Sequence, residues 1–260
     1  MTDFNFRERL AAEMWGEGKL ISLVVGSYRH EVVALCSPLG RQEAEFANGK
    51  FRYFAWTELL GAGGKRIEQG AGIVPVLPDG RLLMVVEQRP PQGRVANRPH
   101  VVERQSGRFI DLAAMGEYSS LEFPGGAIDS TDKSLRAGFL RELGQETGVE
   151  DQTATLYRSL YPVWSFGADI PVKGYFGVVY LAGMRYEEYV HDDGGMYVVA
   201  LSAAEVSRNI ANGVVVSGQA ALLQWNFYRD IRMALQDEEL MQQWLELGYF
   251  VKEEVRLVKP

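Results

Sequence analysis

A short apolar strand, a double-glycine turn and a helix that carries two glutamates follow one another between residues 121 and 148. The turn contains Gly125 and Gly126, and because neither has a β-carbon, backbone amides and carbonyls can approach a neighbouring group closely. Ser134 is a favourable N-cap, and Gly148 stands where a helix ends in a left-handed residue. These signals predict a strand, a tight turn and a helix over residues 135–147.

The two glutamates lie beside the apolar stripe of this predicted helix. At about 100° per residue, the side chains of Leu135, Phe139 and Leu143 fall within an arc of about 80°. Glu142 and Glu146 lie about 20° to either side of Leu135, at the edge of the same arc. An ionised carboxylate in such a place costs several kcal/mol unless another group compensates its charge. The pattern therefore predicts a compensating group beside both glutamates.

A divalent cation would compensate both charges. The spacing of four residues places the β-carbons of Glu142 and Glu146 roughly 5–6 Å apart, which lets the two carboxylates bind one ion or bridge two. Ligation by oxygen alone favours Mg²⁺ or Mn²⁺ over zinc, and the carbonyl of Gly125 would supply a further oxygen. The alternative is that Arg136 or Arg141 neutralises the glutamates.

The pattern of apolar residues divides the chain into an N-terminal β-rich part and a longer mixed part. In the first part, strands are predicted at 20–25, 31–35 and 51–56. In the second part, a hairpin is predicted over 72–77 and 81–87, with strands at 155–161, 173–182 and 197–201 and helices at 217–235 and 238–247. The end at 250–258 is β-prone. The polar segment 90–120 is predicted to be a loop, and loops of this length are usually functional or mobile.

Composition and charge exclude several classes of protein. The net charge of −7 and the pI near 5.2 argue against a broad basic surface for nucleic acid. The single cysteine rules out an intrachain disulfide, and with three histidines it cannot build a Cys/His metal cluster. The N-terminus has no apolar signal core and the apolar runs are too short to span a bilayer, so we expect a cytoplasmic protein without a membrane partner.

The segment from residue 126 to 149 resembles the signature of the Nudix hydrolases. That signature runs Gly, five residues, Glu, seven residues, then Arg-Glu-apolar-x-Glu-Glu-x-Gly-apolar. The residues that match are Gly126, Arg141, Glu142, Leu143, Glu146, Gly148 and Val149. The resemblance implies an α/β fold, namely an α/β/α sandwich with a mixed sheet, over residues 67–235. An N-terminal antiparallel β subdomain at 1–66 and a C-terminal helical extension at 236–260 would flank it.

Within that family, the chain is most similar to the ADP-ribose pyrophosphatase group. The supporting features are the N-terminal β subdomain, residues 85–90 before the long loop, residues 122–126, and the helical segment 220–225. The resemblance implies Mg²⁺-dependent hydrolysis of a nucleoside diphosphate linked to another group, of the ADP-ribose or nucleotide-sugar type. It also implies a homodimer, because the N-terminal part of such proteins often crosses to a second subunit.

Three features depart from the family pattern. The stretch between Gly126 and Arg141 is one residue longer than the signature, so Asp132 or Lys133 stands where a glutamate is expected. Gln145 replaces the first member of the Glu-Glu pair, which keeps an oxygen acceptor but removes one negative charge. The acidic loop that supplies a further glutamate in this group maps near residues 191–195, where only aspartates are available. We therefore expect weaker metal binding and reduced activity.

The resemblance implies a set of catalytic and metal-binding residues. Glu142, Glu146 and the carbonyl of Gly125 would hold the metal ion, which neutralises a diphosphate and lowers the pKa of a bound water. Gln145 is also assigned to the catalytic set, because it stands where the signature has the first glutamate of its Glu-Glu pair. Asp193 would orient or deprotonate water, and the alternative is that it is an ordinary loop aspartate.

The substrate contacts are assigned to Arg89, Glu122, Gly126 and Trp164. Arg89 would clamp a phosphate, and the alternative is a strand-end arginine that pairs with Glu87 or Glu122. Trp164 would stack on a base, and the alternative is a core aromatic residue. Gly126 is included because it matches the first glycine of the signature, and Glu122 is included because it belongs to the segment 122–126 that supports the resemblance.

Two other functions compete with hydrolysis. The altered signature favours a nucleotide-binding or sensory module that keeps the fold and has little or no turnover. A Nudix-like transcription regulator with a C-terminal DNA-binding domain is the other alternative. Residues 201–260 carry six basic and eight acidic side chains, and this balance is wrong for a protein that binds a phosphate backbone.

Overall fold

A computed structural model describes residues 20–25, 28–34, 53–59, 67–89, 93–164, 173–183, 189–191, 196–215 and 218–258. The chain divides into two compact units. One unit comprises Met1–Glu68 with Ser165–Val172, and the other comprises Gln69–Trp164 with Lys173–Pro260. The domains expected from the sequence, 1–66, 67–235 and 236–260, stay predictions.

The first unit contains a three-stranded antiparallel sheet. Its strands are β1 (Leu20–Val25), β2 (Tyr28–Ala34) and β3 (Tyr53–Leu59), in the order β1-β2-β3. The register pairs Leu20 with Val33 and Tyr28 with Leu59. All three strands overlap the ranges predicted from the sequence.

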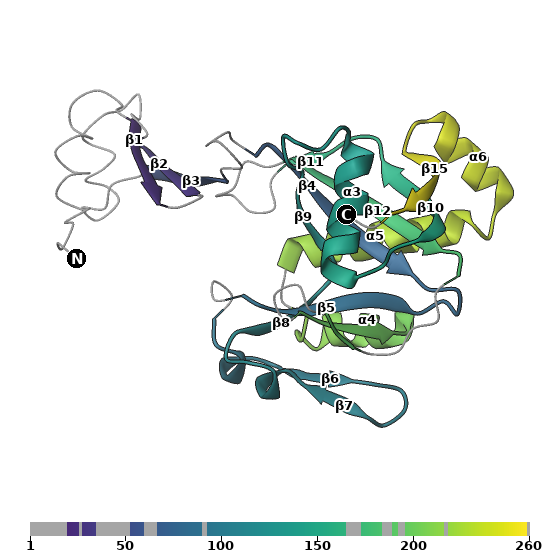
Figure 1. Ribbon diagram of the computed structural model, residues 1–260, viewed down its shortest axis with the longest axis horizontal. Helices are drawn as coiled ribbons and strands as arrows, with labels where there is room; N and C mark the ends of the chain where they lie inside the picture. The colour runs from purple at the N-terminus through teal and green to yellow at the C-terminus, as the bar shows by residue number, and fades with distance from the viewer. Residues whose placement is uncertain are drawn as a thin grey trace, which may run out of the picture. The chain divides into compact units, whose positions relative to one another are not determined.

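The second unit is a mixed α/β structure built on a ten-stranded sheet (Figure 1). The main path of the sheet has the order β13-β14-β5-β4-β12-β10-β15, and β4 and β12 form its parallel pair. This confirms the predicted α/β class and mixed sheet. The strands on this path are β4 (Gln69–Val76), β5 (Leu82–Gln88), β10 (Gln152–Ser159), β12 (Lys173–Leu181), β13 (Tyr189–His191), β14 (Met196–Leu201) and β15 (Phe250–Leu257).

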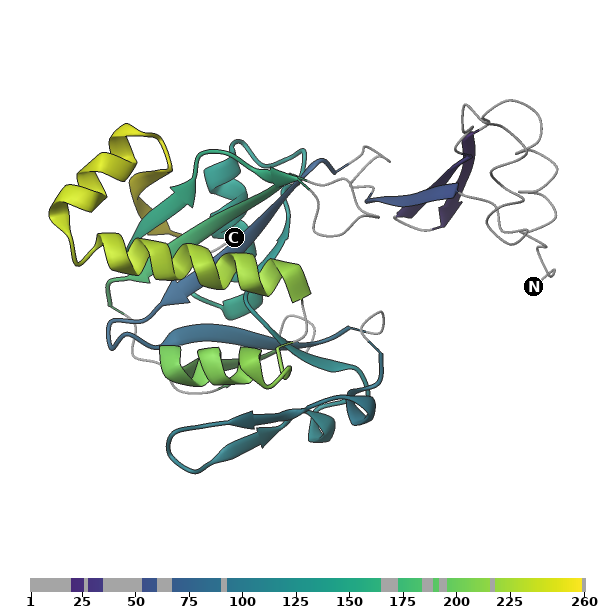
Figure 2. The same ribbon diagram turned by 180° about the vertical axis from the view of Figure 1, so that it is seen from behind.

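Helices cover both faces of this sheet. Helix α3 (Leu135–Thr147) lies in front of β4 in Figure 1, and α5 (Gly218–Ala234) lies in front in the opposite view of Figure 2. Seven consecutive residues of β4 after Gln69 are buried, as expected for a strand with helices on both faces. The layers therefore place α3 and α5 on opposite sides of β4.

Helix α3 packs closely against the sheet. Phe139 and Leu143 are fully buried and belong to a core cluster with Ile73, Leu83 and Val179, among others. A β-carbon at Gly177 would lie 2.6 Å from the ring of Phe139, so the glycine lets the ring lie directly on β12. This packing fixes how far α3 stands from the strands.

At the glycine turn, the segment 119–127 changes its pairing partner from β5 to β4. Strand β8 (Ser119–Glu122) pairs with β5, and β9 (Gly125–Ala127) pairs with β4. The amide of Ile73 donates to the carbonyl of Pro124 at 2.8 Å, which continues the pairing across the turn. The turn is therefore embedded in the sheet, directly beneath α3.

Residues 93–118, predicted as a loop, contain regular structure. They include η3 (Val95–Asn97), the antiparallel pair β6 (Val101–Glu103) and β7 (Phe109–Asp111), and η4 (Leu112–Ala114). Side chains along both strands alternate between exposed and buried: Val102 and Ile110 are buried, whereas Val101 and Phe109 are exposed. The strands are too short for their periodicity to stand out in a polar segment.

A helix that the sequence did not indicate holds this hairpin. Helix α4 (Ala203–Ala211) begins with a capping box formed by Ser202 and Glu205, and it carries the fully buried Asn209. The side chain of Asn209 accepts from the amide of Glu103 at 3.1 Å and donates to the carbonyls of Glu103 and Glu205. Two of these three hydrogen bonds tie β6 to α4, and the third lies within α4.

The C-terminal segment adds both a helix and a strand to the second unit. Helix α6 (Glu238–Glu246) is capped by Asp237, and β15 then pairs with β10 along its whole length. The predicted helix and β-prone end are therefore both present. None of the helices in the described part of the chain combines the length and apolar character needed to cross a bilayer.

Replacement of Asn209 tests the anchoring of the hairpin. We expect Asn209→Ala to lower the free energy of unfolding by roughly 2–3 kcal/mol, because it removes the side-chain partner of both the amide and the carbonyl of Glu103. Amide hydrogen exchange should quicken in residues 101–111. The control is Asn212→Ala, whose exposed side chain makes a single long contact of 3.4 Å with Glu103. Equal effects of the two substitutions would contradict this assignment.

Candidate functional site

The glycine turn and α3 form one polar cluster. The amide of Gly125 donates to Oε2 of Glu146 at 2.8 Å. A β-carbon at Gly126 would collide with the carboxylate of Glu142, and one at Gly125 would collide with the carbonyl of Ala71. The backbone contact with β4 requires glycine at position 125, whereas a β-carbon at position 126 would displace the carboxylate of Glu142. The sequence predicted this close approach, although it assigned the carbonyl of Gly125, and the observed contact uses its amide.

The helix ends are as the sequence predicts. Ser134 accepts a hydrogen bond from the amide of Ala137, and Gly148 ends the helix in the left-handed conformation with φ of 64°. With these ends, Glu142 and Glu146 face the turn and are 8% and 9% exposed. The prediction that both carboxylates lie next to the buried stripe is confirmed.

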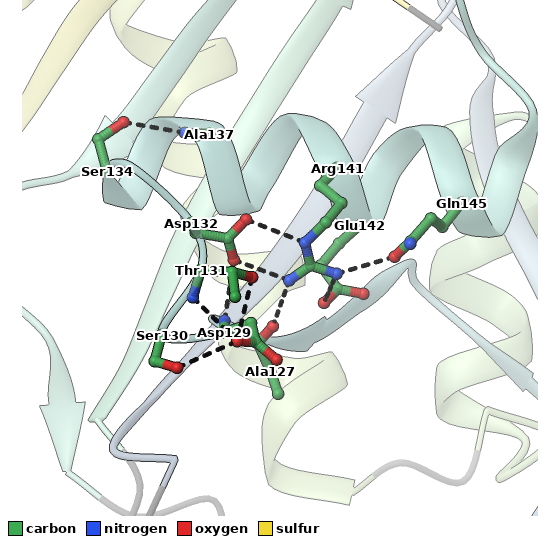
Figure 3. Close-up of polar contacts among 10 residues, drawn as sticks. All are labelled: Ala127, Asp129, Ser130, Thr131, Asp132, Ser134, Ala137, Arg141, Glu142 and Gln145. Carbon is green, nitrogen blue, oxygen red and sulfur yellow. Dashed lines mark hydrogen bonds and ion pairs between the residues drawn. The ribbon is translucent and has the colours of Figure 1, made fainter. Parts of the chain in front are cut away.

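Arg141 connects α3 to the loop that follows the glycine turn (Figure 3). Its guanidinium donates from Nε and Nη2 to the two oxygens of Asp132, at 3.0 and 2.8 Å. Nη2 also donates to the carbonyl of Ala127, and Nη1 donates to Oε1 of Gln145. Nη1 lies 2.7 Å from Oε1 of Glu142 as well. The hydrogen bonds to Asp132, with the Glu142 charge, hold the pKa of Arg141 above its usual value.

Asp132 is an acidic side chain that Arg141 binds, and it also accepts from the amide of Asp129 at 2.8 Å. Which of Asp132 and Lys133 stands at the signature glutamate position stays open. The alternative in which Arg141 neutralises the glutamates is partly realised, because Arg141 pairs with Glu142. Its charge is shared with Asp132, however, and Glu146 is bound by the Gly125 amide.

Arg89 lies between two acidic side chains. Its Nε is 3.1 Å from Oε1 of Glu122, and its Nη2 contacts Oε1 of Glu87. Burial lowers the pKa of Arg89, but the charges of Glu122 and Glu87 outweigh this effect and raise it. The pairing that the sequence gave as the alternative for Arg89 is therefore present, with both glutamates at once. Glu122, predicted to contact substrate, is buried in β8 and binds Arg89.

The acidic groups of the site are short of positive charge. Burial raises the pKa of Glu146 to about 8, opposed by the Gly125 amide and reinforced by Glu87 and Glu142. Burial also raises the pKa of Glu142, against the effect of Arg141. The interacting side chains comprise three guanidinium groups, of Arg89, Arg98 and Arg141, and six carboxylates, of Glu87, Glu122, Asp129, Asp132, Glu142 and Glu146. Ionisation of all of them leaves an excess of negative charge.

The donor set fits a hard divalent cation. Two carboxylates from one face of α3 lie at the glycine turn, that of Glu142 against Gly126 and that of Glu146 on the amide of Gly125. Among the described residues, no three Asp, Glu, His or Cys side chains gather closely enough to hold a metal by themselves. Mg²⁺ commonly binds through one or two carboxylates and completes its shell with water and substrate phosphates. The pair Glu142 and Glu146 matches that mode.

Three further predicted site residues have roles that the contacts leave untested. Gln145 belongs to the cluster through α3, where its side-chain oxygen accepts from Arg141. Trp164 ends the short strand β11 (Val163–Trp164), and its side chain lies outside the described residues, as does Asp193 altogether. Their assigned roles stay predictions.

One residue that contacts the turn was not found from the sequence. Gln224 on α5 is 4% exposed, and its Nε2 donates to the carbonyl of Pro124 at 3.2 Å. The signal was present, because Gln224 falls in register with the buried residues Ala221, Tyr228 and Ile231 on one helical face. A polar residue within a buried stripe indicates a hydrogen-bond partner on the opposing surface.

No protein-family model matches this chain, and a search of curated proteins finds no match. The resemblance stated from the sequence therefore stays a prediction, and the site is interpreted from its own residues.

The raised pKa of Glu146 gives the stability of the protein a pH dependence. The carboxyl titrates near 4.5 in the unfolded chain and near 8 in the fold, so its contribution to stability is fully present below pH 4.5. That contribution is lost as the pH rises through about 8. Without divalent cations, we expect Glu146→Gln to be more stable than the wild type at pH 8 by roughly 1–3 kcal/mol, and the difference to shrink towards pH 5.

Denaturant unfolding in EDTA across this pH range measures the effect. The matched control is Glu246→Gln, an exposed glutamate on α6, which should leave the pH dependence unchanged. Parallel pH profiles of wild type and Glu146→Gln would contradict the burial of an ionisable carboxyl at this position.

Proposed function

We propose that this protein is a Mg²⁺- or Mn²⁺-dependent hydrolase of the Nudix type that cleaves a nucleoside diphosphate linked to another group. The observation that carries the proposal is the pair of buried carboxylates, Glu142 and Glu146, facing the turn of Gly125 and Gly126. Such a pair is stabilised by a divalent cation, and a cation at this place meets the diphosphate of a substrate. ADP-ribose and nucleotide sugars are the proposed substrate types.

Each residue of the cluster has a role in this proposal. Glu142, Glu146 and the carbonyl of Gly125 would hold the ion, which supplies charge neutralisation and a more acidic water. Arg89 would donate its N–H groups to a phosphate oxygen, in place of part of its contact with Glu87 or Glu122. Water adds to one phosphorus, the bridging P–O bond breaks, and two phosphate monoesters leave.

The altered signature lowers the expected affinity for metal. Gln145 contributes no charge, and its oxygen is occupied by Arg141. Arg141 also takes part of the charge of Glu142. Two helical carboxylates remain, so we propose one bound ion and weak binding of any second ion.

A nucleotide-binding module without turnover is the second candidate. The contacts of Arg141 with both Glu142 and Gln145 favour it, because they reduce the charge available to a metal. The nucleoside diphosphate ligand is common to both candidates, and the homodimer stays a prediction for either.

Hydrolysis assays separate the two candidates. Purified protein is incubated with ADP-ribose or a nucleotide sugar and Mg²⁺ or Mn²⁺, and phosphate monoesters are detected after treatment with alkaline phosphatase. We expect metal-dependent turnover that falls by about 100-fold or more in Glu146→Gln, since a direct ligand is lost. Glu246→Gln on α6 serves as the control. Saturable binding without turnover would support the binding module and contradict the hydrolase.

The proposed role of Arg89 has its own test. Arg89→Lys keeps the charge but removes the planar pair of donors, so we expect KM to rise about tenfold with a smaller change in kcat. The control is Arg94→Lys, at an exposed arginine that pairs with Glu117. An unchanged KM in Arg89→Lys would show that Arg89 serves only to hold Glu87 and Glu122.

A further inference from the structure

One peptide group lies between the two helices that cover the sheet. The carbonyl of Pro124 accepts from the amide of Ile73 at 2.8 Å and from Nε2 of Gln224 at 3.2 Å. The N–H of the same peptide group belongs to Gly125, and it donates to Oε2 of Glu146 at 2.8 Å. Gln224 comes from α5 and Glu146 from α3, on opposite faces of the sheet (Figures 1 and 2). The peptide group thus connects them.

The position of Gln224 is closely defined. Its side chain is almost fully buried, at 4% exposure, and it lies against Gly72 of β4. A β-carbon at Gly72 would be 2.8 Å from Nε2 and 2.9 Å from both Cδ and Cγ of Gln224. The amide therefore reaches Pro124 because residue 72 has no side chain. Burial of an amide is unfavourable unless it is hydrogen-bonded, so the bond to Pro124 matters to the fold.

A hydrogen bond donated to a peptide carbonyl makes the N–H of the same peptide group a stronger donor. Electron density moves towards the carbonyl oxygen, and the N–H becomes a stronger hydrogen-bond donor, by roughly 10–30% per bond. The effect is larger where the surroundings are of low dielectric constant, as they are around the buried Pro124. A bond from Gln224 should therefore tighten the bond from Gly125 to Glu146.

We infer that Gln224 is a positioning residue for Glu146, acting from the opposite face of the sheet through the Pro124–Gly125 peptide group. The catalytic consequence of this inference rests on the proposed function, whereas the hydrogen-bond chain does not. An apolar side chain of the same length would fill the same space, so packing alone does not require glutamine here. Gln224 fixes the orientation of the peptide and, through it, the carboxylate that would bind the metal ion.

Two substitutions interrupt this series of hydrogen bonds in different ways. Gln224→Met keeps the length of the side chain and removes its donor. Gly72→Ala keeps the glutamine and displaces its amide, because the added methyl group would lie within 2.9 Å of Cγ, Cδ and Nε2. The control is Gln242→Met on α6, where an exposed glutamine contacts Glu246. Thermal unfolding establishes that each variant is folded before it is compared.

The peptide group can be observed by itself. Pro124-Gly125 is the only Pro-Gly pair in the sequence, so a protein labelled with ¹³C at proline carbonyls and ¹⁵N at glycine gives a single carbonyl-to-amide correlation by NMR. We expect the Pro124 carbonyl carbon and the Gly125 amide proton to move upfield in both Gln224→Met and Gly72→Ala, and to stay in place in Gln242→Met. In calorimetric titrations, the dissociation constant for Mn²⁺ should rise about tenfold in the same two variants.

The outcomes distinguish this inference from the proposed function. Movement of both resonances, with no Mn²⁺ binding even in the wild type, supports the hydrogen-bond chain and overturns the metal-dependent function. Movement of the Pro124 carbon without the Gly125 proton overturns the inference, because Gln224 then contacts the turn without affecting Glu146. Unchanged resonances in both variants overturn it as well, whatever the hydrolytic activity.

Discussion

The contact between Glu146 and the Pro124–Gly125 turn is the interaction on which the site depends. A buried carboxylate needs donors or a cation, and the Gly125 amide supplies only part of that requirement, since the pKa of Glu146 still rises to about 8. The contact exists because α3 lies close to the sheet, which in turn needs the ring of Phe139 to rest on Gly177. Packing of the core and electrostatics of the site are thus set by the same helix position.

Arg141 holds the loop after the glycine turn and helix α3 together. Its guanidinium binds Asp132, the carbonyl of Ala127 and Gln145, so the loop after the glycine turn is held against α3. Asp132 reaches the arginine because its segment is folded by local hydrogen bonds, in which Asp129 accepts from the amide of Thr131.

Local signals predicted a large part of the fold and of the site. The N-cap at Ser134, the end of the helix at Gly148, the hairpin of β4 and β5 and the orientation of both glutamates follow from short-range rules of capping, turn formation and periodicity. The hairpin of β6 and β7 and helix α4 were missed. They support each other through Asn209, which lies 106 residues from Glu103, and no local pattern reports such a bond.

The sequence by itself determined that two carboxylates one turn apart would meet a glycine turn, because helical spacing and the absence of β-carbons are local properties. The tertiary structure alone decided how their charges are shared. It placed Asp132 on Arg141, Glu87 and Glu122 on Arg89, and Gln224 on the carbonyl of Pro124. Hydrogen bonds and ion pairs act only over a few ångströms, and Gln224 lies 100 residues from Pro124 along the chain, so only the packing of helices on the sheet brings such partners together.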